Sequence, residues 1–306
     1  MKRTIQSMLL LLILVTGLSA QSPYVLVLGI AQDAGIPQAG CDSPFCRRAW
    51  KDAKLRQKVS SIALVDPKTG GRWVFDATPD FPEQFQLLKE VSRDTSNRLD
   101  GIFLTHAHIG HYTGLMYLGR ESMNAKAVTV YAMPRMKSVL EAGAPWSQLV
   151  SLRNIVVSPM SDDQTVQLAG ALSVRPFIVP HRDEYSETVG FRISSGNRSL
   201  VFIPDIDKWQ KWRSSLAEVV KGSDYVLLDG TFFRDGEIDR PMSEVPHPFV
   251  TETMELLQDL SSKERSKVHF IHFNHSNLLV QGDAGAVRSV TGKGFGIARE
   301  GQKFGL

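Results

Sequence analysis

Three histidines within six residues are the strongest chemical feature of the sequence, in the segment Thr105-His106-Ala107-His108-Ile109-Gly110-His111. They directly follow residues 99–104, an apolar run typical of a buried strand. Side chains of extended backbone alternate between two faces, so His106 and His108 point to the same side. Imidazoles gathered in this way suit zinc, iron and nickel. The segment predicts a divalent metal site, with three surface loop histidines as the alternative interpretation.

Further candidate ligands stand at the ends of other apolar runs. His181 follows residues 177–180, Asp205 follows residues 201–204, and His272 closes residues 268–272. Each residue alone could equally be a capped loop residue. Ligands collected from several strand ends at one edge of a sheet form a site on a rigid scaffold. Their shared placement therefore favours one common site.

The segments between these residues alternate between strand-like and helix-like patterns. They predict one compact α/β domain over residues 21–306, without linkers or short repeats. The expected strands are 24–28, 99–104, 128–131, 172–179, 189–193, 200–203, 225–228 and 267–273, with a hairpin of 61–65 and 73–76 and a terminal strand pair around 294–304; the expected helices include 82–92, 136–142 and 250–260.

Residues 1–20 have the pattern of a removable secretory signal. Lys2 and Arg3 precede an apolar stretch from about residue 8 to 15, and Leu18-Ser19-Ala20 supplies a small-residue cleavage site. A membrane anchor is the weaker alternative, because a spanning helix needs about 20 apolar residues. We therefore expect a periplasmic or secreted protein with no stable membrane insertion after cleavage.

Composition narrows the classes of partner and of metal site. The 306 residues contain 35 Lys and Arg against 32 Asp and Glu, or +3, and removal of Lys2 and Arg3 leaves 33 − 32 = +1. Without a basic run, nucleic-acid binding is excluded, and a small-molecule substrate is expected. The two cysteines are too few for a disulfide-rich scaffold or a cysteine-built zinc finger.

The order of the motifs resembles the metallo-β-lactamase superfamily, and within it a branch that includes coenzyme PQQ synthesis protein B and the cyclic phosphodiesterase of phosphonate breakdown. The resemblance implies a four-layer αββα sandwich with a metal site at one edge of two packed sheets. It rests on Leu28-Gly29, Gly35-Ile36-Pro37-Gln38, Gly40-Cys41, Ala77-Thr78-Pro79-Asp80, Thr105 to His111, Pro180-His181, Gly190-Phe191, Pro204-Asp205, Leu228-Asp229 and His272-Phe273-Asn274-His275.

The resemblance also implies roles for the individual ligands. His106, His108 and His181 match a first metal site, Asp205 matches the bridging carboxylate, and His111 and His272 match a second site. The implied cofactor is one or two zinc ions, with iron or manganese as alternatives. Three further carboxylates at strand ends or turns are predicted to support the ligands, with turn capping as the alternative: Asp76, Asp80 and Asp229.

Two of the remaining histidines have different interpretations. His247, in Glu244-Val245-Pro246-His247-Pro248, precedes a helix as the acid catalyst of the family does, and it would protonate the leaving group. A solvent-exposed loop histidine is the equally weighted alternative. His269 alternates with the buried residues of its strand, so we interpret it as structural or surface.

The main departure from the family pattern is Gly110, which stands where the family has an aspartate that holds the second metal. The second site would then keep only His111, His272 and the bridging Asp205. It could be weakened, rich in water or empty. If it is merely weakened, Gly110→Asp should raise its occupancy.

A second departure concerns the cysteines. Cys41, Cys46 and His275 match a structural zinc site of the phosphodiesterase-like relatives, but Ser43 stands where the middle cysteine would be. Structural zinc is normally four-coordinate, so this set is one ligand short. A Cys41–Cys46 disulfide, a zinc site and a pair of free thiols remain open alternatives.

These features together predict an exported metal-dependent hydrolase. Metal-bound hydroxide, formed at neutral pH, would attack an ester, lactone or phosphodiester, with Asp205 and His247 as the catalytic groups. One alternative is an iron-dependent oxidation in cofactor biosynthesis, as associated with PQQ synthesis protein B-like proteins. Another is a non-catalytic binding protein, motivated by Gly110. Residues 119–127 and 232–248 are the expected loops over the site.

Overall fold

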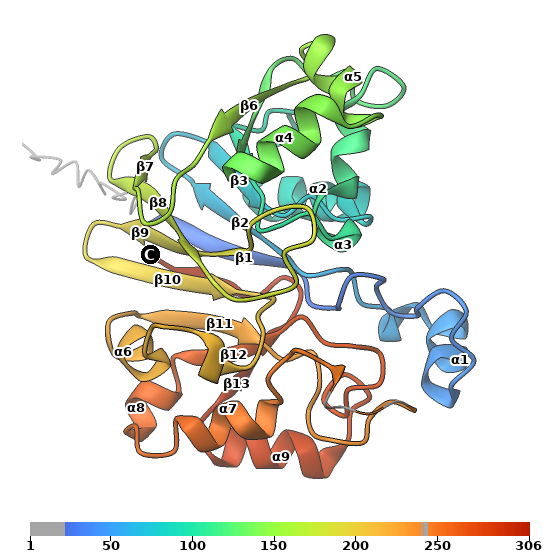
Figure 1. The fold of residues 1–306 in the computed structure, drawn as a ribbon, viewed down its shortest axis with the longest axis vertical. Helices are drawn as coiled ribbons and strands as arrows, with labels where there is room; N and C mark the ends of the chain where they lie inside the picture. The colour runs from blue at the N-terminus through green and yellow to red at the C-terminus, as the bar shows by residue number, and fades with distance from the viewer. Residues whose placement is uncertain (1–21, 240, 242–243) are drawn as a thin grey trace, which may run out of the picture.

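Two seven-stranded sheets lie face to face, with helices on both outer faces (Figure 1). This computed structural model describes residues 22–239, 241 and 244–306, so the predicted signal segment 1–20 lies outside the described residues. The four-layer αββα sandwich, an α/β fold, is confirmed. None of the helices in the described residues is long and apolar enough to cross a membrane.

The first sheet contains most of the N-terminal half, and the predicted hairpin is confirmed, because β2 (Ser61–Asp66) and β3 (Gly71–Phe75) pair antiparallel. Its strands, in spatial order, are β14 (Lys303–Gly305), β1 (Tyr24–Gly29), β2 (Ser61–Asp66), β3 (Gly71–Phe75), β4 (Gly101–Phe103), β5 (Val128–Ala132) and β6 (Ile155–Pro159). The helical segments of this half are α1 (Pro44–Lys51), η1 (Ala53–Leu55), α2 (Phe81–Ser92), α3 (Ile109–Tyr112), η2 (Thr113–Leu118), α4 (Pro134–Ala142) and α5 (Trp146–Ser151).

The second sheet contains strands β7 to β13 of the C-terminal half, and most of them match the predicted ranges. In spatial order they are β13 (Gly296–Ile297), β12 (Val268–Ile271), β11 (Tyr225–Asp229), β10 (Arg198–Ile203), β9 (Val189–Ser195), β8 (Leu172–Ile178) and β7 (Val166–Gln167). The helical segments of this half are η3 (Trp209–Lys211), α6 (Leu216–Lys221), α7 (Val250–Leu256), α8 (Ser262–Arg265) and α9 (Ala284–Gly292).

Two predictions about this half need correction. The strands near the C-terminus do not pair with each other, because β13 joins β12 in parallel while β14 joins β1 antiparallel in the other sheet. The Gly301 N–H donates to the Val27 carbonyl (2.9 Å), which directs the chain across to the first sheet. Helix α7 ends at Leu256 rather than at residue 260, although Leu257 and Leu260 are still buried.

Strand β1 shows how one segment serves two cores. Val25 and Val27 belong to the core shared with the second sheet, whereas Leu26 and Leu28 pack in the core beneath α2, α4 and α5. The alternation follows from the two-residue period of a strand. Because β1 is apolar on both faces, it is fixed inside the sandwich.

The aromatic cluster between the sheets carries a stability prediction. The Phe103 ring stacks on Tyr131 (4.2 Å between centroids) and on Phe75 (5.0 Å), and it meets the edge of Phe191 from the second sheet. Phe103→Ala should lower the free energy of unfolding by about 3–5 kcal/mol, because it leaves a cavity where the sheets meet. Urea unfolding measures the effect, and the matched control, Tyr185→Ala at a 69% exposed side chain, should change little. Equal stability of both variants would contradict the prediction.

Candidate metal centre

Strand directions bring the predicted site residues to one edge of the sandwich. β8 and β10 both pair antiparallel with β9. β11 lies between β10 and β12 and pairs in parallel with each of them. In the other sheet, β1 and β3 both pair antiparallel with β2, and β4 runs parallel to β3. The residues that end or follow these strands are Asp33, Asp76, His106, His108, His111, His181, Asp205, Asp229 and His272.

The first ligand group joins the predicted His106, His108, His181 and Asp205, whose ligand atoms all lie within 4.8 Å of one another. His106 Nε2 lies 2.8 Å from His108 Nδ1 and 3.4 Å from Asp205 Oδ2. His181 Nε2 lies 3.2 Å from the same carboxylate oxygen. Three imidazoles and one carboxylate therefore face a common point.

The second ligand group contains a residue that the sequence analysis missed. His111, His272 and the shared Asp205 are joined by Asp33, again with all ligand atoms within 4.8 Å of one another. Asp33 Oδ1 lies 3.1 Å from His111 Nε2 and 3.4 Å from His272 Nε2. This group therefore offers four candidate ligands, one more than the sequence analysis expected. Asp33 lies in the loop after β1 rather than directly at the end of the strand, so the rule that identified the other ligands does not single it out.

The ring nitrogens that point away from the centre are held by other side chains, which fixes each imidazole in orientation. In His106, His111, His181 and His272 this nitrogen is Nδ1, whereas His108 turns its Nε2 outward. The partners are Thr105 Oγ1 for His106 (2.9 Å), Asp76 Oδ2 for His111 (2.7 Å), Asp207 Oδ1 for His181 (3.3 Å), Thr231 Oγ1 for His272 (2.9 Å) and Glu184 Oε2 for His108 (3.1 Å).

Two of the three predicted supporting carboxylates bond to histidines of the site, and the third does not. Asp76 bonds to His111 and accepts the Thr105 N–H (2.8 Å), and Asp229 bonds to His247 (2.8 Å). Asp80 does not support a ligand: its carboxylate accepts the Val59 N–H (2.7 Å) and so stabilises the backbone beside β2. Asp76 and His272 both have left-handed backbone, with φ of 66° and 68°. Such conformations cost about 1–3 kcal/mol each and cluster at functional sites.

The chemistry of the cluster fits a divalent metal. His181 Nε2 and His272 Nε2 are buried and make no hydrogen bond to any described residue. Burial keeps the pKa of His106 well below its ordinary value, which favours the neutral form that binds metals. Burial alone would raise the pKa of Asp205, but His181 and His247 hold it well below its usual range. Neutral imidazole and ionised carboxylate are the forms that coordinate zinc, iron or manganese.

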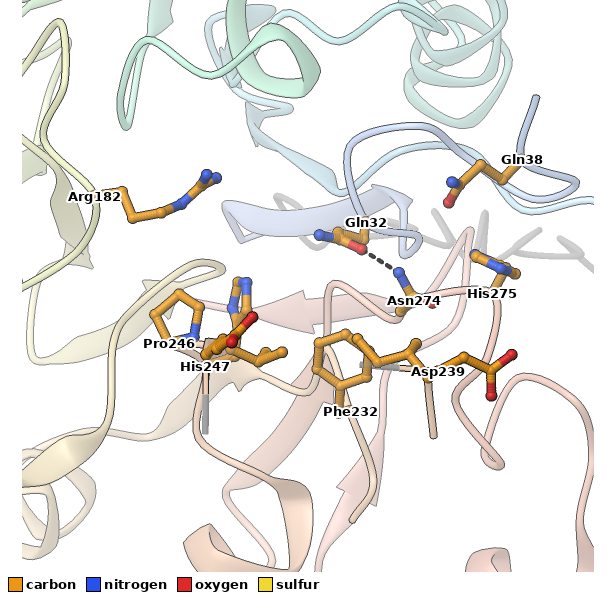
Figure 2. Close-up of a pocket in the computed structure, with 12 residues that line it drawn as sticks. Gln32, Gln38, Arg182, Phe232, Asp239, Pro246, His247, Asn274 and His275 are labelled. Carbon is orange, nitrogen blue, oxygen red and sulfur yellow. Dashed lines mark hydrogen bonds between the residues drawn. The ribbon is translucent and has the colours of Figure 1, made fainter. Parts of the chain in front are cut away.

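His247 lies beside this cluster, on the wall of a pocket of about 400 Å³ (Figure 2). Its Nδ1 lies 2.8 Å from Asp229 Oδ2 and 3.2 Å from Asp205 Oδ1. Burial lowers the pKa of His247, but the two carboxylates more than offset this effect and raise it overall. The two carboxylates therefore favour the protonated form of His247 close to the point where the ligands converge, and the residue is 5% exposed rather than a solvent-facing loop residue.

Of the two loops predicted to lie over the site, only segment 232–248 contributes described residues to the wall of this pocket. Segment 232–248 contributes Phe232, Ile238 and Asp239, whereas none of the described lining residues comes from segment 119–127. Arg182 extends over the pocket from the opposite side, and Gln32 and Asn274, joined by a hydrogen bond, line it between the two (Figure 2). The pocket wall is thus largely polar.

Comparison with known proteins identifies the family. A family model described as "Beta-lactamase superfamily domain" matches residues 72–273. The chain belongs to the metallo-β-lactamase superfamily. The coenzyme PQQ synthesis protein B of Methylorubrum extorquens (strain PA1) is 26% identical over 319 residues, which covers 92% of this chain and 100% of that protein.

Solved structures of this superfamily share the fold. Zn²⁺-bound PqqB from Methylobacterium extorquens matches with a TM-score of 0.77 and 23% identity, over 92% of this chain and 100% of that one. A diphosphatase of the PhnP family matches with a TM-score of 0.65 and 20% identity, over 94% and 98% of the two chains. The resemblance to this branch of the superfamily is confirmed, and the ligand cluster supports a bound metal ion.

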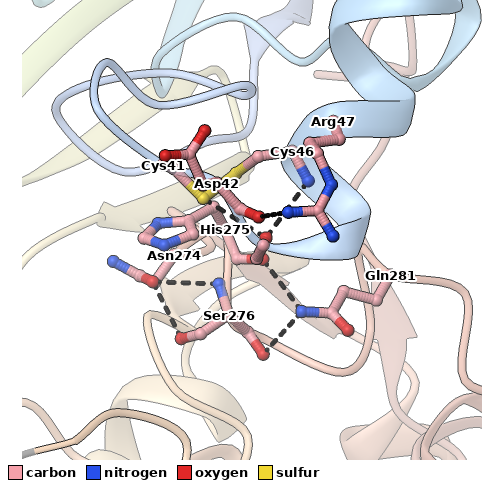
Figure 3. The surroundings of a disulfide bond; sticks show 9 residues. Cys41, Asp42, Cys46, Arg47, Asn274, His275, Ser276 and Gln281 are labelled. Carbon is pink, nitrogen blue, oxygen red and sulfur yellow. Dashed lines mark hydrogen bonds between the residues drawn. A yellow bond between two sulfur atoms is a disulfide. The ribbon is translucent and has the colours of Figure 1, made fainter.

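The structure favours one of the three alternatives for the cysteines. Cys41 and Cys46 form a disulfide with Cα atoms 6.0 Å apart, and His275 lies beside it (Figure 3). A zinc site would need both sulfurs as thiolates. Ser43, at the position of the missing third cysteine, instead caps α1 by accepting the Cys46 N–H (3.2 Å). Ser43 thus has a structural role that needs no metal.

Proposed function

We propose that this chain is an exported metal-dependent hydrolase that acts on an ester, lactone or phosphodiester. The observation that carries the proposal is that two four-residue ligand groups share Asp205, which also lies next to His247 on the pocket wall. Export is supported by the signal pattern of residues 1–20, and the Cys41–Cys46 disulfide is typical of oxidising compartments.

The side chains around the pocket have complementary parts in such a reaction. When bound, a zinc-like ion lowers the pKa of a water molecule to about 7 and polarises the electrophilic centre. His106, His108, His181 and Asp205 would hold this ion. Asp229 orients the His247 ring, whose Nε2 is then available to donate a proton to the leaving group. Arg182 adds a positive charge over the pocket, but Asp239 and Glu244 line the same pocket, so the charges of the lining residues do not distinguish the three substrate classes.

Metal removal tests the proposal directly. The mature protein, purified from the periplasm, should contain a transition metal and hydrolyse at least one of bis(p-nitrophenyl) phosphate, a p-nitrophenyl ester and a lactone. Dialysis against a chelator should abolish hydrolysis and lower the melting temperature, because a ligand that binds only the folded state stabilises it. Added zinc should restore both. Absence of bound transition metal would contradict the proposal, and tight ligand binding without turnover would indicate a binding protein instead.

A second candidate function is an iron-dependent oxidation in cofactor biosynthesis. It is favoured by the similarity to coenzyme PQQ synthesis protein B, which extends over 92% of this chain. Three imidazoles and a carboxylate also suit iron. Protein purified without oxygen would then retain iron and consume oxygen in the presence of a tyrosine-derived substrate. Zinc-restored hydrolysis without oxygen consumption would contradict this candidate.

A further inference from the structure

Asp33 and Gly110 compete for the same space. A Cβ atom built on Gly110 would lie 2.4 Å from the Asp33 Cα, 2.7 Å from its Cβ and 2.8 Å from its Oδ1. Distances below 3.0 Å do not occur in real structures, and one of these contacts is to backbone, which cannot turn aside. Asp33 therefore occupies the volume that a side chain at position 110 would need.

The backbone around Asp33 is anchored to the segment that carries His272. The Phe273 N–H donates to the Ile30 carbonyl (2.7 Å), and the Gln32 N–H donates to the Phe273 carbonyl (2.8 Å). Gly35, with a φ of +69°, closes the turn after Asp33 by donating its N–H to the Gln32 carbonyl (2.8 Å). Asp33 is thus held at a fixed position relative to the residue that follows His272.

The contacts of Asp33 are those of a ligand rather than of a simple ion pair. Its Oδ1 faces both His111 Nε2 and His272 Nε2, at 3.1 and 3.4 Å, and only the first of these contacts has hydrogen-bond geometry. His272 Nε2 therefore stays without a hydrogen bond to a described residue. His111 Nε2 also lies 3.8 Å from Asp205 Oδ2. Two imidazoles and two carboxylates therefore bring their ligand atoms within 4.8 Å of one another.

We propose that Asp33 supplies the carboxylate of a second divalent-metal site, and that Gly110 is the residue that makes room for it. The inference rests on the metal dependence in the proposed function. It replaces the expectation that Gly110 weakens or empties the second site. It also reverses the expected effect of Gly110→Asp, because the new side chain would collide with Asp33.

Zinc titration of metal-free protein, followed by calorimetry and elemental analysis, tests the role of Asp33 without any substrate. The unaltered protein should bind two zinc ions. Asp33→Asn should retain one tightly bound ion and weaken the second at least about tenfold, since partners that only orient a ligand already contribute that much. Asp42→Asn, an equal charge change on an exposed residue near the same loop, should bind both ions normally. Two ions of unchanged affinity in Asp33→Asn, or one ion in the unaltered protein, would overturn the inference.

A swap of the two residues provides an independent test. Gly110→Asp alone should lower the melting temperature of the metal-free protein by about 3 °C or more, because the site is overpacked. In the double variant Asp33→Gly/Gly110→Asp the Cα atom of residue 33 stays 2.4 Å from the added Cβ, so the second zinc ion should remain weakly bound. Gly110→Asp with unchanged stability and two zinc ions would overturn the inference. Two bound ions without hydrolysis of any substrate would instead contradict only the proposed function.

Discussion

His106→Ala is expected to lower the affinity for the first metal ion by about 100-fold or more, and hydrolysis should fall at least as far. The ring is 1% exposed, and its Nε2 lies closest to His108 among the ligands, at 2.8 Å. Loss of a group that merely orients a ligand already costs about 10–100-fold in metal affinity or activity. Removal of a direct ligand should exceed that cost, because the remaining donors of the group leave one coordination position to water.

Zinc titration and hydrolysis assays on the same preparation measure both effects. The matched control is His269→Ala, because His269 is half-buried on β12 and packs against Phe304 (5.0 Å between ring centroids), away from the ligand groups. It should bind metal and hydrolyse substrate as the unaltered protein does. If His106→Ala also keeps normal metal content and activity, the first ligand group is not the reaction centre.

The sequence was informative about His106, His181, Asp205 and His272 because each follows an apolar run. A strand places the next residue at a sheet edge whatever its neighbours are, and strands of like direction present their carboxyl ends at the same edge. Local pattern was therefore sufficient to predict a compact α/β domain with candidate ligands at strand ends. The four-layer sandwich and the roles of the six ligands were implied by the resemblance to the metallo-β-lactamase superfamily.

The position of Asp33 and the pairing of the terminal strands are instead determined by contacts between segments far apart in the sequence. Asp33 lies 78 positions before His111, and nothing in the local pattern indicates which side chain fills the space beside Gly110. The prediction of a strand pair around residues 294–304 was wrong for a similar reason. β13 pairs with β12, whereas β14 pairs with β1, which lies at the other end of the chain and in the other sheet. The prediction that Asp80 supports a metal ligand was wrong, because a carboxylate at a turn can accept a hydrogen bond from the backbone as readily as from histidine.

His247→Gln should reduce turnover by about 10²–10⁴-fold for substrates with an alkoxide leaving group, the usual contribution of a general acid. His247 is oriented by Asp229 and lines the pocket, so the variant loses the proton donor while glutamine fills similar space. p-Nitrophenolate leaves without protonation, so the same variant should hydrolyse p-nitrophenyl substrates at nearly the original rate. Comparison of turnover numbers for an alkyl and a p-nitrophenyl ester of the same acid measures this difference.

The dependence on the leaving group separates proton donation from a structural role. His247 Nδ1 lies 3.2 Å from Asp205 Oδ1, so the substitution could also disturb the ligands. Disturbed ligands would slow both substrates equally and would reduce the zinc content. His275→Gln is the matched control, because His275 lines the same pocket but lies beside the disulfide and belongs to none of the ligand groups that contain Asp205. It should change neither rate, whereas an equal loss on both substrates in His247→Gln would rule out His247 as the acid.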